Sequence, residues 1–252
     1  MKIDYVIVST DGNQLYDGFW DLVKGCWKKI IGVKPVLVTI GDEDSFKETE
    51  EHVLISYKKV DGINTGLQSQ IARLYASTQF GEKTCLISDL DMIPISKTYF
   101  TDNAKGVSSN NLLIYTSDAY GYQDQKRYPM CYNLATSKTF KEIMNIDLSF
   151  QNFAIKLNDL GLGWDTDELF FGSSVFKWEQ SNSDRIVKLH RGFGTGYATR
   201  RIDRGNWGSN NFNLVLEDYY YDCHSLRPYN QYKEQINNLI YLLERKNECK
   251  II

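Results

Sequence analysis

Apolar and polar positions along the first 95 residues alternate in the manner of buried strands joined by amphipathic helices. The apolar run Tyr5–Val8 predicts a short buried strand, which ends in the polar loop Ser9–Gly12. From Phe19 to Ile31 apolar side chains recur every three or four residues, which predicts a helix that ends before Gly32. The next apolar run, Pro35–Ile40, completes a strand–helix–strand unit.

The same alternation continues up to Pro94. After an acidic loop at Gly41–Glu51, the pattern predicts a strand at His52–Ser56, a helix that begins near Gly66 and a strand at Thr84–Ser88. Such an order is typical of a doubly wound parallel sheet, in which ligands bind at the carboxyl ends of the strands.

Beyond Pro94 the pattern becomes a mixture of helices and strands. Strands are expected at Leu112–Thr116 and Met130–Leu134, and helices near Lys138–Asn145, at Ser149–Leu160 and at Gln231–Arg245. The segment Gly192–Asn213 has no periodicity, so we expect a long functional loop there. Because no linker is evident, we predict a single compact α/β domain of two abutting halves, residues 1–95 and 96–228, with a C-terminal helix in 229–252.

Composition limits the classes of function. The chain has 252 residues, 42% of them hydrophobic, and a formal charge of -3, which disfavours a protein that mainly holds nucleic acid. Five cysteines without a C-x-x-C pair favour neither a disulfide framework nor a zinc site. No apolar run suits a signal peptide or a membrane span, so we expect a cytoplasmic protein without an integral membrane segment.

Two carboxylates leave the end of a predicted buried strand at Asp89 and Asp91. Alternate residues of an extended chain point the same way, so the two acids are expected to lie side by side. Such a pair needs a cation nearby, and oxygen ligands favour Mg²⁺ or Mn²⁺. A polar turn that simply follows the strand is the alternative interpretation.

A second acidic cluster, with Asp165, Asp167 and Glu168, follows Gly163 and Trp164. Acids at this position suit the first turn of a helix, so capping alone would account for them. Trp164 beside them could serve as a platform for a sugar ring or belong to the core.

These motifs together resemble the GT-A class of nucleotide-sugar-dependent glycosyltransferases, and the likeness spans nearly the whole chain. The resemblance implies a Rossmann-type mixed sheet, mostly parallel and flanked by helices. It further implies that Asp89 and Asp91 hold Mn²⁺ or Mg²⁺ against the donor diphosphate, with Asp89 also touching the ribose. His190, in a later loop, would be the third metal ligand, with Arg191 beside it to balance phosphate charge.

The second cluster is similar to the Asp-Gln-Asp stretch of the retaining family to which glycogenin belongs, with Thr166 in place of Gln. The resemblance gives Asp165, Asp167 and Glu168 a role in holding the donor sugar and the acceptor. If the reaction inverts the anomeric centre, Asp167 or Asp165 would be the base. The likeness favours retention slightly.

Other residues are candidates for contacts with the nucleotide. The resemblance assigns Thr10, Asp11 and Gly12 to the base and ribose, and Gln70 and Arg73 to nucleotide contacts, although a plain turn and a solvated helix face explain them as well. Four arginines gather between His190 and Asn206, and one or two of them are expected to meet the diphosphate: Arg191, Arg200, Arg201 and Arg204. Nothing in the sequence places His224.

The resulting prediction is a metal-dependent glycosyltransferase that moves a sugar from a nucleoside diphosphate, most readily UDP, to a hydroxyl of a carbohydrate or glycoconjugate. A haloacid-dehalogenase-type phosphatase would use Asp89 as nucleophile and Asp91 as general acid, but that family expects Thr or Val where this chain has Ile93. A nucleotidyltransferase needs a basic loop, and Thr10–Gln14 has no Lys or Arg. A carbohydrate-binding protein without turnover is the non-enzymatic alternative.

Overall fold

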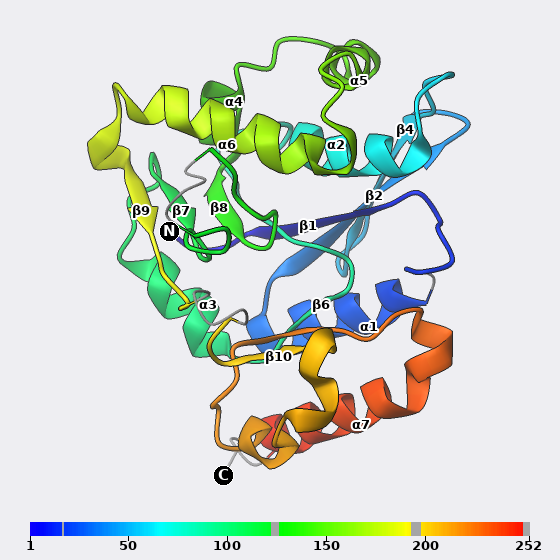
Figure 1. Ribbon diagram of the computed structural model, residues 1–252, viewed down its shortest axis with the longest axis vertical. Coiled ribbons are helices and arrows are strands. Elements are labelled where there is room, and N and C mark those ends of the chain that lie inside the picture. Colours follow the sequence, from blue (N-terminus) through cyan, green and yellow to red (C-terminus); the bar gives the residue numbers. More distant parts are fainter. Residues whose placement is uncertain (17, 122–125, 193–197, 249–252) are drawn as a thin grey trace.

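A mixed sheet lies at the centre of the protein in a computed structural model that describes residues 1–16, 18–121, 126–192 and 198–248 (Figure 1). In the described chain the sheet has eight strands in the order β3-β4-β2-β1-β5-β8-β7-β9. The neighbours β4, β2, β1 and β5 are parallel, whereas β3 and β8 run antiparallel to β4 and β5. The bounds are β1 Tyr5–Thr10, β2 Lys34–Gly41, β3 Ser45–Glu48, β4 Val53–Lys58, β5 Thr84–Ile87, β7 Leu112–Ile114, β8 Asn133–Thr136 and β9 Ile186–Lys188.

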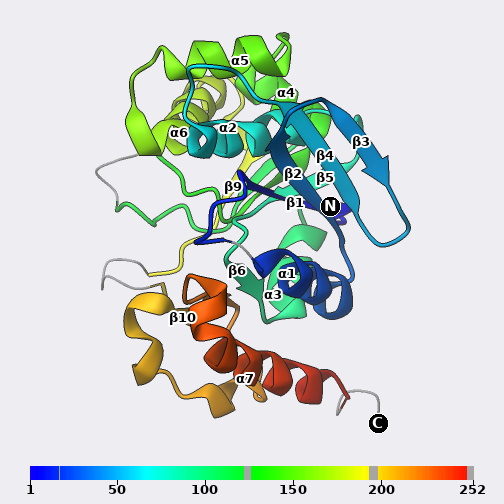
Figure 2. The ribbon, with the colours of Figure 1, turned by 90° about the vertical axis from the view of Figure 1, so that its right-hand side faces the viewer.

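Helices cover both faces of this sheet, as Figures 1 and 2 show. On one face lie α2 (Thr65–Ser77), α4 (Ser137–Met144), α5 (Phe150–Asn158) and α6 (Thr166–Glu179). The other face carries α1 (Phe19–Cys26), which continues into the π-helical turn η1 (Trp27–Ile31), and α3 (Lys97–Lys105). Helix α7 (Tyr229–Glu248) lies farther out on that side.

A small second sheet joins distant parts of the chain beside the main one. It has the order β10-β11-β6, with β6 at Met92–Pro94, β10 at Arg201–Asp203 and β11 at Asp222–His224. Strand β11 is antiparallel to β6, and His224 pairs with Met92. This register brings His224 close to Asp91, one of the two carboxylates of the acid motif (Asp89 and Asp91) that follows β5.

The apolar runs are continuous because the central strands are buried on both faces. Along β1, Val6 and Val8 pack into the cluster on the α1 side, whereas Ile7 packs into the cluster on the α2 side. Successive side chains of a strand point to opposite faces, so one short segment contributes to both cores.

Most of the predicted elements are present, and two segments predicted as loops contain regular structure. The acidic segment 41–51 contains the edge strand β3, whose four residues are all exposed and so give no apolar signal. The segment Gly192–Asn213 is not wholly a loop, since it contains β10 and the 3-10 turns η5 (Arg204–Ser209) and η6 (Phe212–Val215). Its residues 193–197 lie outside the described part of the chain.

The predicted boundary near residue 95 does not divide the sheet, because β5 of the first part pairs with β8 of the second. Strand β8 itself begins three residues later than expected, since pairing with β5 rather than the apolar run sets its position. In the described residues, no helix has the length and apolarity that crossing a membrane requires.

Candidate active site

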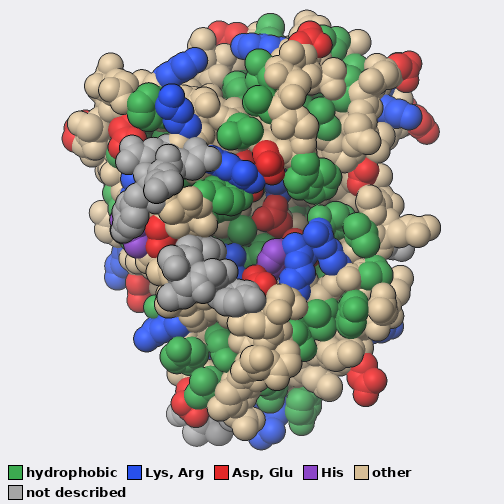
Figure 3. All heavy atoms as spheres, in the orientation of Figure 1, with side chains coloured by type: hydrophobic (Ala, Val, Ile, Leu, Met, Phe, Trp, Pro, Cys, Tyr) green, Lys and Arg blue, Asp and Glu red, His purple; other side chains and the backbone are tan. Residues whose placement is uncertain are grey.

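A cavity of about 880 Å³ opens where β1 and β5 end. Its wall is built from the segment after β1, the first turns of α2, the acid motif after β5, the start of α6, and residues of β10, η5 and β11. Figure 3 shows this face, with acidic, basic and histidine side chains gathered around a hollow in its middle. A cavity at the carboxyl ends of parallel strands is the place where α/β folds bind ligands.

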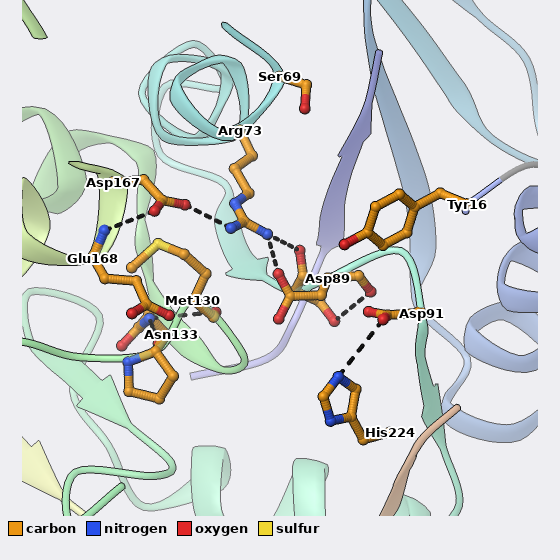
Figure 4. Close-up of polar contacts among 12 residues, drawn as sticks. Tyr16, Ser69, Arg73, Asp89, Asp91, Met130, Asn133, Asp167, Glu168 and His224 are labelled. Atoms are coloured by element: carbon orange, nitrogen blue, oxygen red, sulfur yellow. Dashed lines mark hydrogen bonds and ion pairs between the residues drawn. The ribbon is translucent and has the colours of Figure 1, made fainter. Parts of the chain in front are cut away.

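The acid motif lines the cavity, and its Asp91 carboxylate is buried and faces basic side chains, of which Figure 4 shows His224. Arg204 Nη1 donates to Asp91 Oδ2 at 2.7 Å, and His224 Nε2 and Arg227 Nη1 lie 3.6 and 3.7 Å from the same oxygen. Burial opposes ionisation, but the hydrogen bond and charge of His224, aided by the two arginines, hold the pKa of Asp91 below its ordinary value.

Asp203 fixes the orientation of His224 from the opposite side. The His224 Nδ1 atom lies 3.2 Å from Asp203 Oδ2, so Nε2 is the nitrogen that faces Asp91. Burial lowers the pKa of His224, but the hydrogen bonds to Asp203 and Asp91 outweigh it and raise that pKa.

Arg73 connects the acid motif to the second acidic cluster. Its Nη1 donates to Asp89, and its Nη2 donates to Asp167 Oδ2 at 2.6 Å (Figure 4). The side of α2 that carries Arg73 and Gln70 is therefore not a solvated helix face: Arg73 is 8% exposed and both residues line the cavity. Gln70 Oε1 is buried without a hydrogen-bond partner in the described chain.

The second cluster lines the same cavity. Asp165 is the N-cap residue of α6 but makes no capping hydrogen bond through its side chain, so capping does not account for it. Asp167 is buried, and its Oδ1 accepts from the Glu168 amide. Burial raises the pKa of Asp167, and the ion pair with Arg73 opposes this only in part.

The Arg127 guanidinium binds the first and last acids of the second cluster, Asp165 and Glu168, which we call the outer acids. Arg127 Nη2 donates to Asp165 Oδ1 at 2.7 Å, and its Nε donates to Glu168 Oε2 at 2.8 Å. The Tyr120 hydroxyl donates to the same Glu168 oxygen at 2.7 Å, and the guanidinium carbon lies 4.1 Å from the centre of the Tyr120 ring. Burial raises the pKa of Glu168.

The loop after β1 contributes two of its three predicted residues to the cavity, namely Thr10 and Asp11. The Asp11 carboxylate accepts from the Thr65 hydroxyl at 2.9 Å and from the Asn13 amide at 3.2 Å. Gly12 is not part of the wall, and its φ of 77° explains the glycine, since other residues rarely adopt that conformation.

Two predicted residues lie elsewhere. His190 is exposed and contacts Ser117, because strand β9 takes this segment to the edge of the sheet beside β7. Arg191 is buried and makes a bidentate ion pair with Asp222. Neither residue lines the cavity, so the placement of His190 beside Asp89 and Asp91 is corrected: His224 is the histidine that lies there.

Of the predicted arginine group, Arg201 and Arg204 line the cavity. Arg201 also pairs with the buried Asp222, and Arg200 donates to the Tyr221 hydroxyl instead of facing the cavity. Arg227 is a further basic residue of the wall that the sequence did not indicate.

The donor types at the acid motif fit a hard divalent ion, since carboxylate oxygens from Asp89 and Asp91 and an imidazole from His224 suit Mn²⁺. In this structure both carboxylates already accept hydrogen bonds from arginines, Asp89 from Arg73 and Asp91 from Arg204. Within the part of the chain that the structure describes, no three His, Cys, Asp or Glu side chains are grouped so as to hold a metal ion.

Comparisons with known proteins find similarity to this chain only among solved structures. No protein-family model matches the chain, and no curated protein matches it. It is similar to the galactosyltransferase LgtC in complex with donor and acceptor sugar analogues, with 10% identity and a TM-score of 0.49 over 96% of this chain and 95% of LgtC.

A second similar structure is the apo form of the glycosyltransferase GlyE of Streptococcus pneumoniae TIGR4, with 13% identity and a TM-score of 0.49. That match covers 99% of this chain but 64% of GlyE, so the chain spans somewhat less than two thirds of that protein. At such identities and TM-scores, no residue's role can be transferred from these proteins.

Proposed function

We propose that the protein is a glycosyltransferase that takes a sugar from a nucleoside diphosphate, with UDP as the expected nucleotide, and passes it to a hydroxyl of a carbohydrate or glycoconjugate. The observation that carries this proposal is the single cavity, about 880 Å³ in volume, that joins a cation-rich end at Asp91 to a carboxylate-rich end at α6. Its volume lies within the ~300–1,000 Å³ usual for small-molecule sites.

The cation-rich end suits a diphosphate. A guanidinium has five N–H donors, of which Arg204 uses one on Asp91 and Arg227 one on Tyr16 among the described residues. The remaining donors can bind phosphate oxygens and stabilise the charge that develops on the leaving diphosphate. Metal dependence enters the proposal through the ligand types alone: a divalent ion bound at Asp89, Asp91 and His224, once Arg73 and Arg204 had moved off the two carboxylates, would add positive charge at the same place.

The carboxylate-rich end suits a sugar. The hydrogen bonds to the outer acids fall on Asp165 Oδ1 and Glu168 Oε2, which leaves one oxygen of each to accept from sugar hydroxyls. Asp167 is a poor candidate for a base, because both of its oxygens already accept hydrogen bonds and it is buried. The proposal keeps retention of the anomeric configuration, with these acids binding sugar, and Asp165 is the remaining candidate base if the product proves to be inverted.

The test is a screen of UDP-, GDP- and dTDP-sugars with Mn²⁺, in which sugar release and transfer to simple glycoside acceptors are measured. We expect turnover with at least one UDP-sugar, and NMR of the product gives its anomeric configuration. Calorimetry with UDP provides a second readout that does not depend on the acceptor.

Each rival function gives a different result in the same experiments. Hydrolysis of phosphate monoesters without use of any nucleotide sugar would indicate the phosphatase. Binding of carbohydrate without binding of UDP or turnover would indicate a carbohydrate-binding protein. Either result would overturn the proposal.

A further inference from the structure

Trp164 is an aromatic residue on the wall of the cavity whose side chain is largely exposed. It belongs to the 3-10 turn η2 (Gly163–Asp165) and is 65% exposed, more than any other large apolar residue in the described chain. By contrast, Trp27 and Trp178 are buried. An indole ring contributes to stability only where it is covered, so a largely bare ring in a polar cavity indicates a surface for a flat ligand.

The ring lies at one particular corner of the cavity. A Cβ atom placed on Gly66 would lie 3.7 Å from Trp164 Cζ3 and 3.8 Å from Asp11 Oδ2. Gly66 is in the first turn of α2, so Trp164, Gly66 and Asp11 meet where β1 ends and α2 begins. The absence of a side chain at Gly66 keeps this corner open beside the ring.

The polar groups beside this corner differ from those that Arg127 holds. Asp165 and Glu168 each give one oxygen to Arg127, whereas the corner offers the Asp11 carboxylate and the Thr65 hydroxyl that donates to it. One carboxylate beside an aromatic face suits a heterocycle that has an N–H group on its edge, rather than a ring with many hydroxyls.

We infer that Trp164 is the stacking platform for the nucleobase of the donor, with Asp11 accepting a hydrogen bond from the base edge or the ribose. The inference rests on the proposed function and assigns Trp164 to the base, where the sequence left a sugar platform and a place in the core as alternatives. Stacking of a base on an aromatic side chain contributes about 1–3 kcal/mol, which corresponds to roughly fivefold to 150-fold in affinity.

The experiment compares uridine, UMP and UDP as ligands of the wild-type protein and of Trp164→Ala, Trp164→Phe and Trp20→Phe. Affinities come from calorimetry, and quenching of tryptophan fluorescence gives a separate readout. Trp164→Ala is expected to weaken all three ligands by the same factor, at least about fivefold, because all three share the base. Trp164→Phe should keep most of the affinity but lose the quenching.

Trp20→Phe is the control, since Trp20 lies on α1 against His52 and does not line the cavity. It should bind as the wild type does and keep the quenching. Because Trp164 is so exposed, its variants are expected to melt at the wild-type temperature.

Three results would overturn the inference, and they are distinguishable. If Trp164→Ala binds uridine and UDP like the wild type, the ring does not contact the base. If it weakens only a UDP-sugar, Trp164 is a sugar platform, and the proposed function stands. If the wild-type protein binds no nucleotide at all, the proposed function fails and the inference fails with it.

Discussion

Acidic and basic side chains meet at both ends of the cavity, but in opposite proportions. Near β6 a single buried carboxylate, that of Asp91, faces Arg204, Arg227 and His224. Near α6 a single guanidinium, that of Arg127, is shared by Asp165 and Glu168. The first end therefore keeps spare hydrogen-bond donors, and the second keeps spare acceptors.

Under the proposed function, this difference would place the two chemical parts of a nucleotide sugar at opposite ends of the cavity. Phosphate oxygens only accept hydrogen bonds, so they bind where donors remain free. Sugar hydroxyls donate as well as accept, so they bind where carboxylate oxygens remain free. Arg73 contacts both ends through its ion pairs with Asp89 and Asp167.

The largest effect is expected from Asp91→Asn at the cation-rich end. The charge of Asp91 orients Arg204 and His224, so its loss should reduce transfer by about 1,000-fold and weaken UDP binding. Steady-state kinetics and calorimetry measure the two effects. Asp102→Asn, at an exposed position of α3, is the matched control and should leave both unchanged.

The stability of Asp91→Asn is a separate readout. Removal of the charge relieves repulsion by Asp89 but leaves Arg204 without its counter-charge, whereas His224 keeps Asp203 as a partner. The Arg204 side chain is 27% exposed and can turn to water, so we expect the free energy of unfolding to fall by no more than ~2 kcal/mol. A larger loss in denaturant titrations would mark Asp91 as a structural residue.

Asp167→Asn tests whether the carboxylate-rich end acts on transfer without acting on the affinity for UDP. The expected result is a loss of transfer of at least ~100-fold while the affinity for UDP changes little, because Asp167 lies at the end assigned to the sugar. Asparagine keeps an oxygen for Arg73, which limits the structural damage. If UDP binding falls as much as transfer, Arg73 transmits the change and the two ends are not separable.

The main sheet could be predicted from the sequence because its strands are buried on both faces. Val6, Ile7 and Val8 form an unbroken apolar run for that reason, and the same holds at β2 and β5. Strand β3 could not be predicted, since it lies at an edge and is exposed along its length. Pairing with a neighbour, not burial, makes it a strand.

The site could be predicted most directly where chemistry and strand ends coincide. Asp89 and Asp91 follow a buried strand, so their position in the chain already indicates their position in space. The histidine could not be chosen in this way. His224 reaches Asp91 because β11 pairs with β6, and that register depends on residues more than a hundred positions apart, which no local pattern records.

Arg204→Gln tests the N–H donors of the Arg204 guanidinium that do not bind Asp91. Glutamine keeps a hydrogen bond to Asp91 but removes the charge and the remaining guanidinium donors. UDP should bind about tenfold more weakly, whereas uridine, which has no phosphate, should bind as to the wild type. Calorimetry with both ligands measures the ratio, and an equal loss for both would show that Arg204 does not serve the diphosphate. Arg245→Gln, in the last turns of α7, is the control.

The smallest effect is expected from Glu168→Gln. Glu168 and Asp165 share Arg127, so after the substitution the guanidinium keeps its bond to Asp165 and the amide oxygen can still accept from Tyr120. Transfer should therefore fall only about fivefold, through a higher KM for the acceptor or the donor sugar, with the affinity for UDP unchanged. Glu82→Gln, at an exposed position, is the matched control in the same kinetic assay. A loss of ~100-fold or more in kcat, with KM unchanged, would contradict this division of the cavity, because it would make Glu168 a group that acts in the chemical step rather than one of two carboxylates that bind sugar.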